Sequence, residues 1–443
     1  RQRDNPSMVK AGRAFIAIMF FVGLIGVLVN GAPIFSRFLY SSVLLALFAW
    51  GWTRLIIRSL SFERVTRELR ANVGDVFEET FKLSNRSRLP IPWVEIVNKS
   101  TLPFAAGSRL FTLVPGKQFR SYMARTWLTR RGRFELGPTR ITVGDPFGLF
   151  ATSKEHKSKD ALIVFPMIHE IYAFQTPQGV LTGGQVIRKK SPDITPHAAG
   201  VREYVSGDAM KRIHWSTSAR RNRLMVKEFE QDPQAEVWLY LDAHQTVHYQ
   251  KRHEQQEMAL HDMLLNKRPK IKLPPSTLEY GVSIAASLAH YFLRQRRSVG
   301  FASAGQTFTV LPAERSERQE AKILETLAFV KADGNLSLAG LVATQAAVLP
   351  QGSTVILITP TIRSDLLQAV DDLVYHYLSP VIVLLNAKSF EGPSGTAELV
   401  SSLKARRVPV ITISCDDDLP QALADISSNF NLQELHAWRT PLS

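Results

Sequence analysis

Two long apolar runs near the start of the chain predict a pair of helices. Residues 14–29 read AFIAIMFFVGLIGVLV, and residues 38–52 read FLYSSVLLALFAWGW, with the turn-forming stretch 30–33 between them. Each run is slightly shorter than the roughly 20 residues that cross a ~30 Å hydrocarbon core, and flanking residues can complete the span. We therefore predict a membrane hairpin. The alternatives are a buried hairpin of a soluble core and a cleaved signal peptide.

The charges around the two runs predict their orientation. Four basic residues precede the first run and four closely follow the second, whereas the loop between the runs carries only Arg37. Because cytoplasmic flanks carry an excess of Lys and Arg, both outer ends of the hairpin are expected in the cytoplasm. The soluble parts of the chain would then face the cytoplasm.

The pattern changes to short strands at about residue 61. In VFEETFKL, residues 76–83, apolar and polar positions alternate, and turn signals such as Pro115-Gly116 and Leu136-Gly137-Pro138 separate the runs. Short strands at regular spacing predict an antiparallel β-sandwich-like domain. Its expected role is structural, or to present a strand edge to a partner.

After residue 235 the pattern changes again, to apolar strands that alternate with amphipathic helices. The strand candidates are residues 237–241, 299–303, 355–359, 381–385 and 409–414. This alternation predicts a mostly parallel sheet covered on both faces, with ligands at the carboxyl ends of its strands. Residues 244–275 form a polar insert. No G-x-G-x-x-G or G-x-x-x-x-G-K-[ST] motif occurs, which disfavours a Rossmann dehydrogenase or a P-loop NTPase.

Length and composition agree with several folded parts. A chain of 443 residues is too long for one ordinary core, and we expect a transmembrane helical hairpin at 1–60, the β domain at 61–165, a connecting segment at 166–234 and the α/β domain at 235–443. The net charge of +15 favours an acidic partner, whether lipid, nucleic acid or protein. The single cysteine, Cys415, excludes an intramolecular disulfide and a thiolate metal cluster.

The connecting segment contains the most distinctive residues. Residues 200–230 read GVREYVSGDAMKRIHWSTSARRNRLMVKEFE. The motif positions in it are Tyr204, Gly207, Asp208, Arg212, Ile213, His214, Trp215, Ser218, Ala219 and Arg220. Together with Arg131-Gly132-Arg133-Phe134 and the stretch Asp145–Phe150, they resemble the bacterial family called domain of unknown function 58 (DUF58).

The resemblance implies more than the pattern alone. Members of this family look like proteins of the bacterial cytoplasmic (inner) membrane, with a β-sandwich and a Rossmann-like α/β domain similar to von Willebrand factor A. They are commonly encoded beside MoxR-type AAA+ ATPases, which implies such an ATPase as a partner. No enzymatic activity is established for the family.

The motif residues allow a structural and a functional interpretation. Asp208 can cap a short helix that starts near Ala209, and Ile213 and Trp215 can pack on a neighbouring domain. Arg212 and Arg220 would then pair with carboxylates, which makes the segment a clasp between domains. Alternatively, the arginines bind an acidic partner, a phosphate or lipid head groups. A catalytic His214 is the third possibility, but no partner for it is identifiable from the spacing.

The family resemblance also suggests a place for a metal, because von Willebrand-type domains often bind Mg²⁺ through D-x-S-x-S. Here Asp242 and Thr246 keep the first and last oxygen ligands, whereas His244 replaces the middle hydroxyl. The loop at residues 359–361 lacks an aspartate, and Asp365 is expected too far into the next helix to replace it. We therefore expect a degenerate site without a cofactor, with Mg²⁺ at Asp242 and Thr246 as the alternative.

A transition metal is a further alternative, since His248 and His253 lie in the polar insert, although their spacing matches no standard zinc pattern.

The leading hypothesis for the whole chain is a membrane-anchored adaptor or scaffold and not an enzyme. Binding of anionic lipid or nucleic acid through the basic segment is the second hypothesis, with nucleic acid disfavoured because no aromatic series accompanies the charges. A cryptic hydrolase is the third, although no nucleophile elbow or H-E-x-x-H is present. Neither the client of the protein nor its oligomeric state follows from the sequence.

Overall fold

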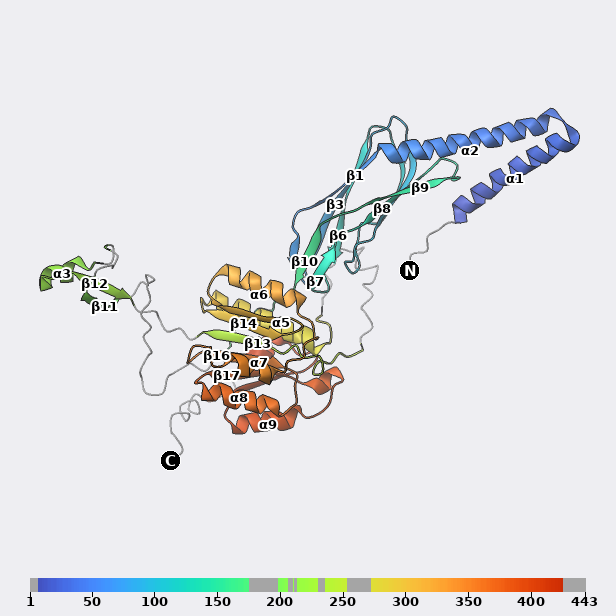
Figure 1. Ribbon diagram of the computed structural model, residues 1–443. Helices are drawn as coiled ribbons and strands as arrows, with labels where there is room; N and C mark the ends of the chain where they lie inside the picture. The colour runs from blue at the N-terminus through green and yellow to red at the C-terminus, as the bar shows by residue number, and fades with distance from the viewer. Residues whose placement is uncertain are drawn as a thin grey trace. The chain divides into compact units, whose positions relative to one another are not determined.

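The computed structural model describes residues 7–174, 198–205, 210, 213–229, 236–252 and 272–424. The chain divides into two compact units, Arg1–Met167 and Ile168–Ser443, and each is described by itself (Figure 1).

The first unit begins with two antiparallel helices, α1 (Ser7–Asn30) and α2 (Pro33–Ser59). Gly31 makes the turn in a left-handed conformation, and Pro33 starts α2 where its missing N–H costs nothing. The helices approach closely at Gly23, where an added Cβ would lie 2.9 Å from the Leu39 backbone nitrogen. Both helices are long and apolar enough to cross a membrane, and only 11% of each apolar window is buried. The two predicted apolar helices are thus present, and their apolar windows are largely exposed.

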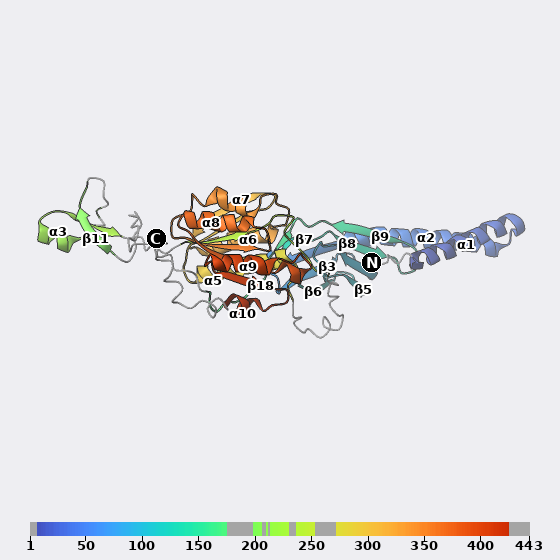
Figure 2. The same cartoon turned by 90° about the horizontal axis from the view of Figure 1, so that it is seen from below.

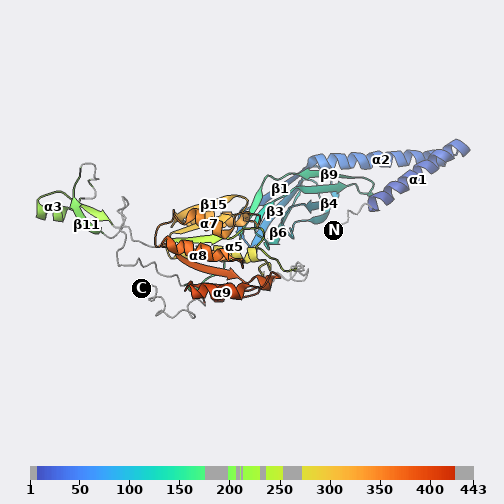
Figure 3. The same cartoon turned by 60° about the horizontal axis from the view of Figure 1, so that its bottom comes forward.

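The remainder of the first unit is β structure. Its strands are β1 (Leu60–Thr66), β2 (Arg70–Asn72), β3 (Val76–Asn85), β4 (Ile91–Asn98), β5 (Arg109–Val114), β6 (Phe119–Trp127), β7 (Gly132–Glu135), β8 (Thr139–Gly144), β9 (Ala151–His156) and β10 (Ala161–Phe165). They form sheets with the orders β1-β3-β6, β5-β4-β8-β9 and β2-β10-β7. Figure 3 shows β9 beside α2, which it contacts.

One hydrophobic core joins the first two of these sheets to the end of α2. The alternating burial of β3 puts Phe81 and Leu83 inside, where they pack with residues of β4, β6 and β8. Ile56 and Ile57 of α2 belong to the same cluster. The last part of α2 is therefore a core element of the β region, which is why the helix extends beyond the apolar run that ends at Trp52.

The second unit contains a six-stranded sheet. Its strands are β13 (Val237–Leu241), β14 (Val299–Ala304), β15 (Phe308–Glu314), β16 (Thr354–Thr359), β17 (Ser379–Leu385) and β18 (Val410–Ile413), in the order β15-β14-β13-β16-β17-β18. All neighbouring pairs are parallel except β14 and β15. The sequence pattern did not predict β15, the strand at the antiparallel edge, because its residues are only partly buried or exposed.

Helices cover both faces of this sheet. They are α5 (Thr277–Arg294), α6 (Glu317–Phe329), α7 (Leu338–Gln345), α8 (Asp365–Tyr375), α9 (Thr396–Ala405) and α10 (Leu419–Ala424), with a 3₁₀ turn, η2, at Ala387–Phe390. α7, α8 and α9 share one core cluster with Tyr240 and Leu357 of the sheet. Gly281 of α5 meets Leu241 and Ile358 on the opposite face. Figure 2 shows α7 and α8 on one side of the sheet and α5 and α10 on the other.

Candidate functional site

Asp242 occupies the first position after β13, at the carboxyl edge of the sheet. β13 pairs in parallel with β16, and the Asp242 N–H donates to the Ile358 carbonyl at 3.0 Å. This pairing places the residue beside Thr359, whose hydroxyl donates to Asp242 Oδ2 at 2.7 Å. The His244 N–H donates to Oδ1 at 3.0 Å. Both carboxylate oxygens of Asp242 are therefore engaged within the protein.

Burial dominates the electrostatics of this carboxyl. Asp242 is only 3% exposed, and burial raises its pKa above the ordinary value. The hydrogen bonds from Thr359 and the His244 amide, and the charges of His248 and His244, oppose the increase in pKa. His248 also lies 2.9 Å (Nε2) from the Asp242 carbonyl oxygen. It is thus held against the backbone of the site.

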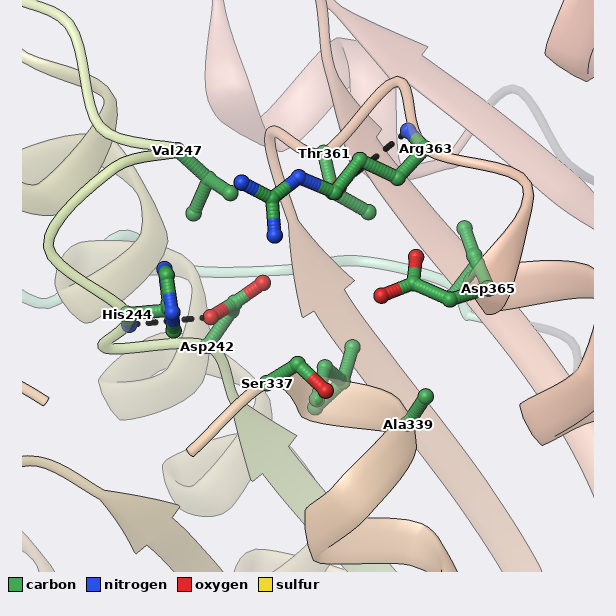
Figure 4. A pocket seen from close by; sticks show the side chains of 10 residues that line it. Asp242, His244, Val247, Ser337, Ala339, Thr361, Arg363 and Asp365 are labelled. Carbon is green, nitrogen blue, oxygen red and sulfur yellow. Dashed lines mark hydrogen bonds between the residues drawn. The ribbon is translucent and has the colours of Figure 1, made fainter. Parts of the chain in front are cut away.

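A small hollow opens beside Asp242 (Figure 4). Its lining residues are Asp242, His244, Val247, Ser337, Leu338, Ala339, Thr361, Arg363, Asp365 and Leu366. In Figure 4 the carboxyl groups of Asp242 and Asp365 both point into it, and Ser337 lies below them. Asp365 therefore reaches the site from the first turn of α8, contrary to the expectation that it would lie too far away.

Ser337 and Arg363 were not among the candidates from the sequence. The Ser337 hydroxyl accepts a hydrogen bond from the Gly340 N–H at 3.2 Å and so caps α7. The preceding turn is held close to the sheet, since a Cβ on Gly334 would come within 2.0 Å of the Ala304 carbonyl oxygen. A serine ahead of a helical run is an N-cap signal that could have located the helix start. The signal could not have located the hollow.

Arg363 extends its side chain across the hollow. The side chain is exposed, and its Nη2 donates to the Thr246 hydroxyl at 2.9 Å. Across the described part of the chain, no carboxylate forms an ion pair with this guanidinium. Thr246 in turn lies 2.9 Å (Oγ1) from Nδ1 of His244. The guanidinium thus binds a neutral hydroxyl and keeps most of its donors available.

These residues do not fit a divalent cation. Of the two ligands named for the alternative with Mg²⁺, Asp242 has both carboxylate oxygens hydrogen-bonded, and the Thr246 hydroxyl accepts a hydrogen bond from the Arg363 guanidinium. The positive charge of Arg363 at Thr246 disfavours a cation bound through that hydroxyl. Among the residues that the structure describes, no group of three or more His, Cys, Asp or Glu side chains could hold a metal ion. His253, named for the zinc alternative, lies outside them.

The motif residues of the connecting segment form a small unit of their own. β11 (Ala198–Glu203) pairs with β12 (Met225–Phe229), and α3 (Trp215–Arg221) lies between them in the sequence. The Ser218 hydroxyl accepts from the Met225 N–H at 2.8 Å and donates to the His214 carbonyl at 3.0 Å. The His214 ring accepts from the Thr217 N–H at 3.2 Å and caps α3. Ser218 and His214 thus serve the local fold.

The other motif residues differ in exposure. Ile213 is buried and forms an antiparallel bridge with Val226, whereas Trp215 is 68% exposed. Ala219 and Arg220 are also exposed. Gly207, Asp208 and Arg212, with the predicted cap at Asp208, lie outside the described residues.

The fold and the site define a class of protein: an α/β domain with a polar hollow at the carboxyl edge of its sheet, in a chain that also carries two apolar helices and a β-rich region. The family profile described as "Protein of unknown function DUF58" matches residues 200–268. An uncharacterized protein of Bacillus subtilis (strain 168), YeaD, is 26% identical over 291 residues, which cover 62% of this chain and 64% of the relative. Both findings support the DUF58 family for this protein.

Two solved structures are similar to about a quarter of the chain. The CARDB domain of the PF1109 protein from Pyrococcus furiosus is 14% identical over 24% of this chain and 91% of that domain, with a TM-score of 0.18. The cupredoxin domain of amoB from Nitrosocaldus yellowstonii is 11% identical over 25% of this chain and 89% of that domain, with a TM-score of 0.19. Scores this low carry no argument about fold or function.

Proposed function

We propose that this protein is a membrane-anchored adaptor whose α/β domain binds a carboxylate side chain of a partner protein, without catalysing a reaction. The apolar, largely exposed surfaces of α1 and α2 support the anchor, because a soluble environment would leave both surfaces in water. The charge asymmetry around the hairpin supports a cytoplasmic orientation in a bacterial inner membrane.

The topology supports the location of the binding face. In doubly wound sheets with the strand order 3-2-1-4-5-6, ligands bind at the carboxyl ends of the strands where the order reverses. In this sheet the reversal lies between β13 and β16, which are followed by Asp242 and by the loop to Arg363. The arrangement also agrees with the von Willebrand factor A-like fold that the family resemblance implies, and we propose that fold for the second unit. For the middle region we propose a β-sandwich.

Arg363 is the observation that carries the proposed function. An exposed guanidinium without a carboxylate partner among the described residues presents a planar set of donors that matches a carboxylate. The N-termini of α7 and α8 border the same hollow and add positive potential. In metal-dependent domains of this type the cation receives the partner's carboxylate, and here we assign that role to Arg363.

The MoxR-type AAA+ ATPase implied by the family resemblance is the partner to test. The experiment is capture of the ATPase by the full chain from gently solubilised membranes, followed by affinity measurement with the purified proteins. Arg363→Gln is expected to weaken binding about 10- to 100-fold, since a hydrogen bond to a charged group contributes ~1.5–3 kcal/mol. The affinity of Arg363→Lys should lie between that of the wild type and that of Arg363→Gln, because lysine keeps the charge and loses the bidentate geometry.

Asp365→Asn is the matched control in the same hollow. It should bind at least as well as the wild type, because it removes a negative charge close to the incoming carboxylate. If Asp365→Asn abolishes binding and Arg363→Gln does not, the partner presents a basic group and the proposal is wrong. If no ATPase binds in any nucleotide state, the choice of partner is refuted.

A second candidate function is binding of anionic lipid by the connecting segment. Trp215 and Met210 are 68% and 71% exposed, and Arg220 and Arg221 of the same segment are exposed too. Exposed aromatic and basic side chains together suit a membrane surface. Flotation of the full chain does not separate this activity from the hairpin. The test is therefore a Trp215→Ser/Arg220→Gln/Arg221→Gln variant, measured for its contact with phosphatidylserine in nanodiscs.

A further inference from the structure

The turn between β8 and β9 is the motif Asp145-Pro146-Phe147-Gly148-Leu149-Phe150, to which the proposed function gives no role. Asp145 is fully buried, and its carboxylate accepts from the N–H groups of Phe147 at 2.8 Å and Phe150 at 2.6 Å. Gly148 adopts a left-handed conformation, with φ of +67°, at the tip. The turn is thus built around Asp145, while the Phe147 ring remains 53% exposed.

This turn contacts both apolar helices of the same unit. Arg13 Nε of α1 donates to the Leu149 carbonyl at 2.8 Å, and its guanidinium lies 5.4 Å from the centre of the Phe150 ring. A Cβ on Gly12 would be 3.1 Å from the Gly148 oxygen, so α1 and the turn are in close backbone contact. On α2, the Phe48 ring lies 6.4 Å from that of Phe147, at an angle of 63°.

The contacts place the turn where the apolar part of the hairpin ends. Arg13 is the last charged residue before the first apolar run. In α2, Trp50 is 52% exposed and has the Arg54 guanidinium over its ring, an arrangement typical of a membrane interface. Ile56 and Ile57, which follow Arg54 in the same helix, belong to the β core. Phe48 and the adjoining Phe147 therefore lie at the boundary between lipid-facing helix and soluble domain.

We infer that residues 145–150 form a lipid-contacting wedge, in which Phe147 inserts into the interfacial layer beside Phe48 and Arg13 clamps the turn onto α1. The inference rests on the proposed membrane placement of the hairpin. Burial of a phenylalanine ring that otherwise faces water favours the insertion. The wedge would give the β region a third attachment to the bilayer and limit its rotation about the end of α2.

The test uses the full chain with Cys415→Ser, reconstituted in phosphatidylcholine nanodiscs, with one cysteine carrying the fluorophore NBD. The label is placed at Phe147→Cys. Phe104→Cys is the matched control, a phenylalanine that is 42% exposed in the turn following β4. This turn lies at the far end of β8, ~17 Å away along the strand. Leu44→Cys, at a position on α2 that is 66% exposed, reports whether the hairpin itself is inserted.

The label at 147 is expected to lose most of its quenching by aqueous iodide and to gain quenching by doxyl-lipids, whereas the label at 104 does neither. Adding Arg13→Gln should restore iodide quenching at 147 and leave the label at 44 protected. If 44 is protected and 147 is quenched as strongly as 104, the wedge is refuted and the anchor stands. If 44 is also quenched by iodide, the membrane placement and the wedge both fail.

Discussion

The buried ion pair between Arg64 and Glu79 gives a quantitative test of how the β region is stabilised. The two side chains are 4% and 1% exposed, and Arg64 Nε donates to Glu79 Oε1 at 2.8 Å, with a second, shorter bond from Nη2. The guanidinium also lies 5.3 Å from the centre of the Phe81 ring. Burial raises the pKa of Glu79, and the Arg64 charge and hydrogen bond oppose that increase. The cost of removing the two charged groups from water is therefore opposed by their mutual attraction.

Removing one partner should cost far more than removing both. Arg64→Met leaves the Glu79 carboxylate buried without its counter-ion, which destabilises a fold by about 3–5 kcal/mol. The double variant Arg64→Met/Glu79→Leu fills the same space with apolar atoms and should return to within ~1 kcal/mol of the wild type, or exceed it. At about 1.4 kcal/mol per factor of ten, the single variant should accelerate hydrogen exchange in β3 by roughly 100- to 4,000-fold.

The assay is hydrogen–deuterium exchange of the full chain in detergent, with peptides from β13 and β16 of the other unit as internal controls. Acid should rescue the single variant. A raised pKa in the folded state means that the ionised carboxyl penalises folding above that pKa, and the penalty disappears below the pKa of the unfolded chain. The loss should thus shrink as the pH falls through this window. A single variant with wild-type protection, or a double variant as labile as the single, would refute the reasoning.

Two further predictions concern the hairpin and Asp242. Gly23→Ile should separate α1 from α2, because its Cβ would lie 2.9 Å from a backbone nitrogen, at a cost of about 1–3 kcal/mol. Cross-linking of a cysteine pair across the helices should fall, while Gly51→Ile, with nothing within 4 Å, leaves it unchanged. Asp242→Asn should stabilise the α/β domain at neutral pH, because burial penalises the ionised carboxyl. The gain in melting temperature should vanish as the pH approaches the ordinary pKa of aspartate. A loss of stability at neutral pH would mean that the bonds from Thr359 and the His244 amide dominate.

Local pattern was sufficient for most of the elements. The apolar runs predicted α1 and α2, and the alternation in residues 76–83 predicted β3, because an amphipathic or apolar period follows directly from which face each residue buries. The apolar strands of the second unit were located within a residue or two for the same reason. Edge strand β15 was not predicted. It pairs with a neighbour on one side only and is partly exposed to solvent, so its sequence shows no regular alternation of buried and exposed residues.

The site was beyond the reach of local pattern. The sequence suggested Asp242 and Thr246 through spacing, but the hydrogen bond between Asp242 and Thr359 joins residues 117 positions apart. Only the parallel pairing of β13 with β16 brings them together. The same pairing brings Arg363 to Thr246, so that a positively charged side chain lies beside one of the two candidate cation ligands.

The two apolar helices show the same division. Their existence is determined by composition, because apolar runs as long as residues 14–29 and 38–52 have few alternatives to a helix. Where the second helix ends was decided by tertiary packing, since Ile56 and Ile57 bury themselves in a core built from strands that follow later in the chain. Tertiary packing also put the turn at residues 145–150 against Arg13 of α1. Arg13 and Leu149 are 136 residues apart in the sequence, and they meet because β8 and β9 lie alongside α2, the partner helix of α1.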